Sequence, residues 1–140
     1  MKRCIMFLFF SLCMCGTLFA QSHPYPYRVV FDLTSKDSLD HKAVVRWISE
    51  IYAQEPKAEV EVVMYAKGLE MVMPERSVVT GGVEAAMHNP NVSFRVCEIA
   101  MKNNNVLKSQ LLPKVQTVPD GIYEIVSKQK EGWAYIKVSH

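Results

Sequence analysis

Short β-branched segments alternate with segments of helical period along most of the chain, and this alternation restricts the fold more than any other feature. The segment Arg28–Leu33 is almost continuously apolar, which is typical of a parallel strand covered on both faces. Strands that alternate with helices pair in parallel, because each crossover returns the chain to the same end of the sheet. The expected strands are residues 27–33, 59–65, 92–97, 114–118 and 133–138.

The first two intervening segments carry helix signals. Asp37 or Ser38 can cap a helix whose apolar residues form one stripe facing the sheet. Residues 78–87 are expected to form a second helix, although the Gly81-Gly82 pair weakens it. That pair lacks the glycine spacing of a phosphate-binding loop, so it indicates a blemish in the helix or a tight packing site.

Two further helices complete the predicted fold. A short helix is expected to begin near Ile99, and a longer one has Pro119 in its first turn. The residues of the longer helix that are expected to face inward are Ile122, Ile125 and Val126. Five strands joined by about four helical connections predict the α/β class. We expect a flavodoxin-like open sheet of five mainly parallel strands with helices on both faces.

The first twenty residues have the pattern of an export signal. Lys2 and Arg3 precede a short apolar stretch that closes at Ala20, the expected last residue removed. A lipoprotein signal needs small residues before the modified cysteine, whereas Met14 precedes Cys15. We therefore expect cleavage rather than anchoring, and an exported, periplasmic or extracellular protein from a bacterium.

Removal of this leader, residues 1–20, would leave a single α/β domain, residues 21–140. The leader carries two of the 16 Lys and Arg residues and none of the 14 Asp and Glu residues, so the remainder is formally neutral. A neutral chain without a basic run has no electrostatic footprint for nucleic acid or for an anionic membrane. We expect neither as a partner after cleavage of the leader.

Cys97 is the single cysteine outside the leader, and it lies where an apolar strand meets a short helix. Because ligands collect at the carboxyl ends of parallel strands, this position favours a functional role. A helix start, Lys102 or protonated His41 would favour the thiolate, and Glu98 would oppose it. The competing interpretation is a small, inert core residue, which is how most free cysteines behave.

Other chemistries have weaker support in the sequence. Its four histidines, His23, His41, His88 and His140, are scattered and form no familiar zinc pattern with Cys97. Three carboxylates near the first helix, Asp32, Asp37 and Asp40, are interpreted as capping and solvating that helix rather than as acid/base groups. No serine lies in a nucleophile elbow. We expect no cofactor and no metal.

Six segments in order resemble the DsrE/DsrF-like sulfur-relay family over nearly the whole chain after the leader. They are Val29–Leu33, His41-Lys42, Val62–Leu69, Val92–Cys97 ahead of Met101-Lys102, Val118–Ile122 and Gly132–Ile136. The resemblance implies a flavodoxin-like subunit that assembles into trimers or hexamers and carries sulfur as a persulfide on the cysteine matching Cys97. Export departs from that pattern, because the well-understood members look cytoplasmic, so the sulfur donor and acceptor stay open.

Under this resemblance, a persulfide on Cys97 needs an ionised thiol and an apolar pocket that shields the outer sulfur. Such a pocket would draw on Gly68, Leu69 and Met71, with His41 on its rim. A neighbouring subunit or a partner protein would donate or accept the sulfur. Two hypotheses follow: a sulfur carrier or transferase that uses Cys97, or a non-enzymatic oligomeric binding module in which Cys97 is a core residue.

Overall fold

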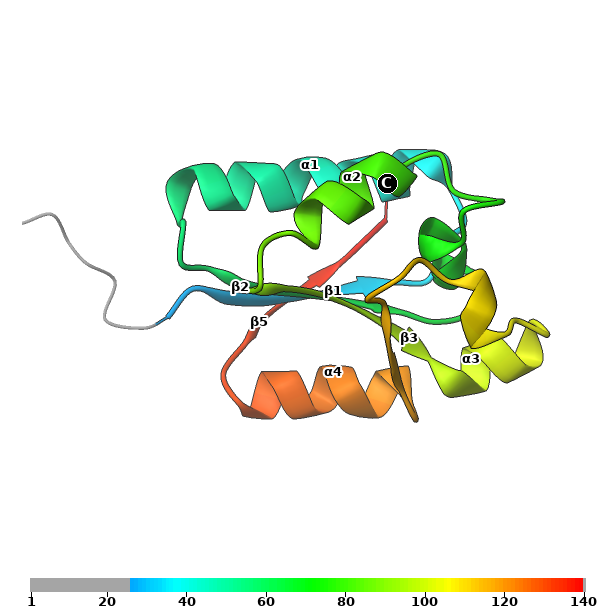
Figure 1. The fold of residues 1–140 in the computed structure, drawn as a ribbon. Coiled ribbons are helices and arrows are strands. Elements are labelled where there is room, and N and C mark those ends of the chain that lie inside the picture. Colours follow the sequence, from blue (N-terminus) through cyan, green and yellow to red (C-terminus); the bar gives the residue numbers. More distant parts are fainter. Residues whose placement is uncertain (1–25, 140) are drawn as a thin grey trace, which may run out of the picture.

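A computed structural model describes residues 26–139 and contains one open sheet (Figure 1). Its strands are β1 (Arg28–Leu33), β2 (Glu59–Met64), β3 (Val92–Cys97), β4 (Gln116–Val118) and β5 (Ala134–Lys137). They pair in the order β4-β3-β2-β1-β5, and all four pairings are parallel. The α/β class and the flavodoxin-like open sheet predicted from the sequence are therefore confirmed. The predicted export signal lies outside the described residues.

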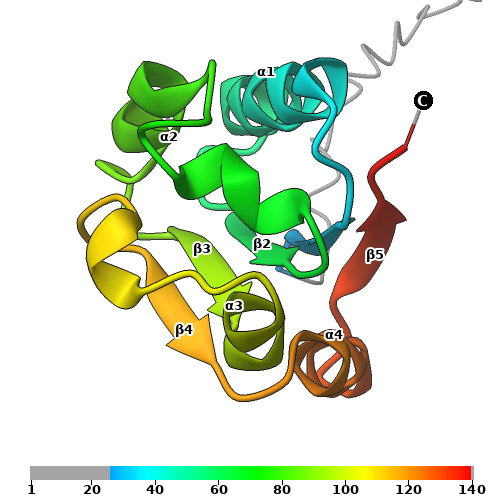
Figure 2. The same ribbon diagram turned by 90° about the vertical axis from the view of Figure 1, so that its right-hand side faces the viewer.

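Helices cover both faces of this sheet. The helices are α1 (Ser38–Gln54), α2 (Thr80–Ala86), α3 (Glu98–Asn103) and α4 (Gly121–Lys130), with 3₁₀ helices at Gly68–Val72 and Lys108–Gln110. Figure 1 shows α1 and α2 on one face and α4 on the other, and the turned view in Figure 2 places α3 beside the ends of β3 and β4. The predicted cap is confirmed, because Oδ1 of Asp37 accepts a hydrogen bond from the amide of Leu39 at 2.8 Å.

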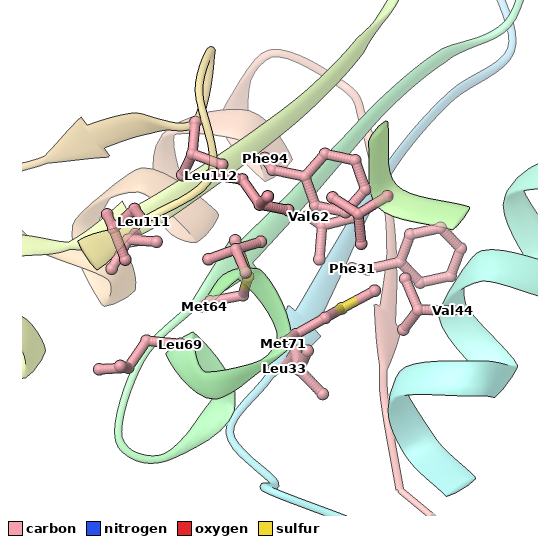
Figure 3. Packing of buried hydrophobic residues seen from close by; sticks show 14 of the residues in the cluster. Phe31, Leu33, Val44, Val62, Met64, Leu69, Met71, Phe94, Leu111 and Leu112 are labelled. Atoms are coloured by element: carbon pink, nitrogen blue, oxygen red, sulfur yellow. The ribbon is translucent and has the colours of Figure 1, made fainter. Parts of the chain in front are cut away.

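The main apolar core lies between the sheet and α1, α2 and the first 3₁₀ helix. Side chains of the central strands fill it, among them Phe31, Val62, Met64 and Phe94 (Figure 3). Trp47 of α1 stacks on Phe31, with ring centroids 5.9 Å apart. Most of the buried apolar surface thus belongs to this one face of the sheet.

Helix α2 packs closely against α1 through one of its two glycines. A Cβ at Gly82 would lie 2.7 Å from Cγ1 of Val45, whereas a Cβ at Gly81 would meet no atom within 4 Å. The Gly81-Gly82 pair is therefore a packing site, one of its two sequence-based interpretations, and only Gly82 makes the close contact.

Two predictions about helix α4 are wrong. Pro119 does not lie in its first turn, because Asp120 is the capping residue and the helix begins at Gly121. Ile122 and Val126 do not face inward: they are 55% and 42% exposed, and only Ile125 is buried. The sheet face under α4 offers few apolar partners, so a narrow stripe of the helix suffices to cover them.

That face instead carries a buried charge. Glu61 of β2 is 1% exposed, and its Oε2 accepts from Ser93 Oγ at 3.2 Å and pairs with Arg95 Nε at 2.8 Å. Lys128 of α4 reaches the same oxygen at 3.5 Å. Burial raises the pKa of Glu61, although the neighbouring Arg95 and Lys128 charges oppose the rise. An ionic cluster thus joins α4 to the sheet where apolar packing is sparse.

Candidate functional site

Cys97 lies at the carboxyl edge of the sheet, as the sequence predicts. It is the last residue of β3 and the residue before α3, and its thiol is unpaired. The residue is only 4% exposed, yet it lines a groove of about 390 Å³. Other lining residues include Tyr65, Ile99, Asn103, Asp120 and Ile122. Cys97 is thus a nearly buried residue in the lining of an open depression.

The first residue of α4 brings that helix close to the cysteine. A Cβ at Gly121 would lie 3.2 Å from Cβ of Cys97 and 3.4 Å from Cδ1 of Tyr65, so a larger residue would crowd both. The preceding residue, Asp120, directs Oδ1 to the amide of Ile122 at 2.8 Å. The groove is therefore bounded by the start of α4 on one side and by α3 on the other.

A polar cluster around Asp32 adjoins this groove through Tyr65. Asp32 of β1 is 5% exposed, and its Oδ2 accepts from Tyr135 Oη at 2.7 Å and from Tyr65 Oη at 3.2 Å. Lys137 Nζ donates to Asp32 Oδ1 at 2.9 Å and to Thr34 Oγ1 at 3.0 Å. The cluster lies where the strand order reverses, because β5 returns to the far side of β1.

Burial and the carboxylate of Asp32 together raise the pKa of both phenols. Burial, with the Asp32 charge next in importance, raises the pKa of Tyr65 to about 12. The hydrogen bond to Asp32 is the main cause that raises the pKa of Tyr135 to about 12. A thiolate at Cys97 would add the smallest of the contributions that raise the pKa of Tyr65. Tyr65 thus acts as a neutral wall of the groove, with its hydroxyl proton directed to Asp32.

The sequence did not indicate this cluster, because its members are far apart in the chain. The interpretation of Asp32 as a group that caps and solvates the first helix is wrong, since this residue of β1 is 5% exposed and bonds to Tyr65, Tyr135 and Lys137. One signal was present: Asp32 interrupts the apolar run Arg28–Leu33. A charged residue inside a buried strand requires buried partners. Only the pairing of β5 with β1 identifies those partners as Tyr135 and Lys137.

The supporting residues predicted for Cys97 lie elsewhere, and none of them is among the residues that line the groove. His41 is buried in α1, where its Nε2 lies 2.9 Å from the carbonyl oxygen of Ser35. Lys102 is exposed on α3. Gly68 packs against the carbonyl group of Leu33, and Leu69 and Met71 are fully buried in the main core (Figure 3). The shielding pocket expected from these three residues is thus a part of the core.

Two further features, a metal-binding group of side chains and a membrane-spanning helix, are not found in the described part of the chain. Residues 26–139 contain no group of three or more His, Cys, Asp or Glu side chains that could hold a metal ion. In the same range, none of the helices has both the length and the apolar character needed to cross a membrane.

Comparison with known proteins identifies the fold and no activity. No protein-family model and no curated protein matches the chain. Among solved structures, the chain is similar to a protein of unknown function, MTH1491 from Methanobacterium thermoautotrophicum, with a TM-score of 0.74 and 29% sequence identity. That similarity covers 79% of this chain and 98% of the other. A second chain with this arrangement therefore supports the fold, while the function rests on the geometry of the site.

Proposed function

We propose that the protein carries or transfers sulfane sulfur as a persulfide on Cys97. One observation carries the proposal: Cys97, a residue with an unpaired thiol at the carboxyl edge of a parallel sheet, lines an open groove, although it is only 4% exposed. The walls are apolar at Tyr65, Ile99 and Ile122 and polar at Asn103. Such walls can shelter an outer sulfur from solvent thiols while leaving one direction of approach open.

The proposed reaction is an exchange of sulfur between thiols. The Cys97 thiolate attacks the outer sulfur of a persulfide donor, so a new S–S bond forms while the donor's S–S bond breaks and the donor leaves as a thiolate. An acceptor thiolate then attacks the outer sulfur on Cys97, and the Cys97 thiolate is the leaving group. No external oxidant or reductant is consumed, because the sulfane sulfur keeps its oxidation state in both steps.

The competing function is a binding module of the same fold without chemistry. In its favour, Cys97 is 4% exposed and also contacts the apolar core, together with Met101 and Ala100 of α3. Under this hypothesis Cys97 is a small packing residue, and the methionines of the core only fill space. The two functions differ in one measurable property, the reactivity of the native thiol.

Mass measurement after incubation with a sulfane donor tests the proposal. Wild-type protein should gain the mass of one sulfur atom on the peptide containing Cys97, and the variant C97S should gain none there. Reaction with a small alkylating reagent provides the second measurement. A native thiol that stays unlabelled while the unfolded protein labels fully would remove the chemistry and leave the binding module.

The proposal includes assembly into a homo-oligomer, trimeric or hexameric, and export after removal of residues 1–20. Supporting assembly, a hollow of about 610 Å³ lies beside the edge strand β5. Its lining is apolar at residues such as Tyr27, Trp47 and Ile136 and polar at Glu50, Gln54 and Glu55. An exposed sheet edge is a ready pairing surface. Light scattering should find an oligomer, and I136K should dissociate it without unfolding the subunit, because Ile136 is 37% exposed. A wild-type monomer would contradict the assembly.

A further inference from the structure

The groove beside Cys97 has a one-sided charge. Among its lining residues, Asp120 is the single ionisable group besides Tyr65 and Cys97, and no Lys, Arg or His side chain is present. A helix N-terminus attracts anions through its free amides, but at α4 the carboxylate of Asp120 already accepts from the amides of Ile122 and Tyr123, at 2.8 and 3.4 Å. The groove therefore offers a negative charge and no cationic partner.

Tyr65 and the start of α4 bound the groove next to Cys97. Tyr65 is held by its hydrogen bond to Asp32, and Gly121 places the first turn of α4 against Cys97. Cys97 is 4% exposed, and the groove is the opening that it lines together with Asp120. A reagent that enters the groove to reach the thiol therefore comes close to the carboxylate of Asp120.

We infer that this groove selects uncharged sulfane-sulfur donors and disfavours anionic ones such as thiosulfate. The inference rests on the proposed function and assigns its substrate class. With a neutral trisulfide, RS–S–SR, the Cys97 thiolate attacks the central sulfur, so that a trisulfide Cys97 Sγ–S–SR forms and RS⁻ leaves with the electron pair of the broken S–S bond. Thiosulfate would bring two negative charges next to Asp120 and the Cys97 thiolate, and Coulomb repulsion would slow its approach.

Two alkylating reagents of nearly equal size test the charge selectivity. Iodoacetamide is neutral and iodoacetate is anionic; in both reactions the thiolate forms an S–C bond and iodide leaves. Labelling rates are measured on the peptide that contains Cys97, and their ratio is divided by the ratio for free N-acetylcysteine. We expect wild-type protein to prefer iodoacetamide by an additional factor of about three to five, the effect of one unit charge at short range in a solvated site.

The variant D120N assigns this preference to one carboxylate, because asparagine is also a good helix cap. Its normalised ratio should fall toward one, and salt should have the same effect on the wild type by screening. D37N is the matched control: Asp37 caps α1 through the same 2.8 Å bond to an amide two residues later, and this variant should keep the wild-type ratio.

Three outcomes would overturn the inference: a wild-type ratio near one, a preference that D120N leaves unchanged, or a native thiol that neither reagent labels. Donor experiments separate it from the proposed function. If thiosulfate and a neutral trisulfide load Cys97 equally fast, the carrier function stands and the selectivity is wrong. Suppose instead that no donor adds sulfur to Cys97, while its thiol still reacts faster with iodoacetamide than with iodoacetate. The carrier function is then wrong, and the selectivity of the groove for uncharged reagents stands.

Discussion

The two faces of the sheet differ in what they bury. On the face covered by α1 and α2, inward residues such as Phe31 and Phe94 are apolar and nearly inaccessible. On the face covered by α4, the apolar contact is confined to a small cluster centred on Val30, Val63 and Ile125, and the remaining inward positions hold polar groups. Because successive side chains of a strand point to opposite faces, the same five strands build both layers.

This difference predicts that one face mainly determines the stability of the fold and that the other mainly affects the proposed chemistry of Cys97. The polar groups of the α4 face form two clusters, around Glu61 near the middle of the sheet and around Asp32 at its carboxyl edge. The cluster around Asp32 touches the cysteine groove through Tyr65. We therefore expect substitutions on the α1 face to change mainly the free energy of unfolding, and substitutions around Asp32 to change mainly the reactivity of Cys97.

The largest effect is expected from truncating the α1-face core. Phe94 is 1% exposed, and F94A should lower the free energy of unfolding by about 3–5 kcal/mol, through lost burial and a residual cavity. Urea denaturation followed by circular dichroism measures the change. Y123A, at a tyrosine that is 73% exposed on α4, should lower it by less than about 0.5 kcal/mol. Similar losses in both variants would contradict the assignment of stability to the α1 face.

The Glu61 cluster should make the α4 face sensitive to pH. Because burial raises the pKa of Glu61 in the folded state, the folded protein binds that proton more tightly than the unfolded chain does. This contribution to stability is fully present below the unfolded pKa and is lost as pH rises through the folded pKa. The free energy of unfolding of wild type minus that of E61Q should therefore decrease between pH 4 and neutral pH.

Denaturation of both proteins across that pH range provides the measurement. E84Q, which removes an exposed carboxylate of α2, controls for the general loss of one negative charge. A difference between wild type and E61Q that grows with pH would show that the ion pairs with Arg95 and Lys128 outweigh the burial of Glu61, contrary to the assigned direction.

Neighbouring glycines of α2 offer a smaller and more local test of the α1 face. G82A should destabilise the protein by about 1–3 kcal/mol, because its Cβ would lie 2.7 Å from the stiff side chain of Val45. G81A should stabilise it by about 0.5–1 kcal/mol, since its Cβ meets open space and alanine is the better helix former. Thermal denaturation of the pair gives both values, and equal shifts would contradict the close packing of α1 on α2.

Local signals made much of the fold predictable from the sequence. Strand runs, the cap at Asp37 and the position of Cys97 between β3 and α3 each depend on residues close together in the chain. The face of α4 was predicted less well, because periodicity identifies an apolar stripe and not the width that the sheet can cover. Ile122 and Val126 belong to that stripe and remain exposed, since polar side chains occupy much of the sheet beneath α4.

The surroundings of Cys97 could not be predicted from the sequence, for a different reason. Tyr65 and Asp120 approach the thiol only after β2, β3 and α4 take their places at one edge of the sheet. The resemblance to sulfur-relay proteins suggested Gly68, Leu69 and Met71 instead. The turn that follows β2 packs Gly68 against Leu33 and buries Leu69 and Met71 in the main core, away from the lining of the groove. Spacing along the chain does not show on which face a turn places its side chains.

The smallest change in stability is expected from removing the hydrogen bond between Tyr65 and Asp32, and this test sharpens the comparison of the two faces. Y65F keeps the ring and removes the 3.2 Å hydrogen bond to Asp32, which should lower the free energy of unfolding by only about 1 kcal/mol. A freed ring exposes the thiol more often, so labelling of Cys97 by iodoacetamide should accelerate by up to about fivefold, the population shift that 1 kcal/mol allows.

The control variant Y123F removes the hydroxyl group of a tyrosine on α4 that is 73% exposed. It should leave both the free energy of unfolding and the labelling rate of Cys97 unchanged. An unaltered labelling rate in Y65F would mean that packing alone, including the contact at Gly121, fixes the ring. The Asp32 cluster would then be a structural feature of the sheet edge like the Glu61 cluster, and the chemistry of the α4 face would be confined to the groove. An accelerated labelling rate would instead show that Asp32 helps to control access to Cys97. Asp32 is 5% exposed and lies where the strand order reverses.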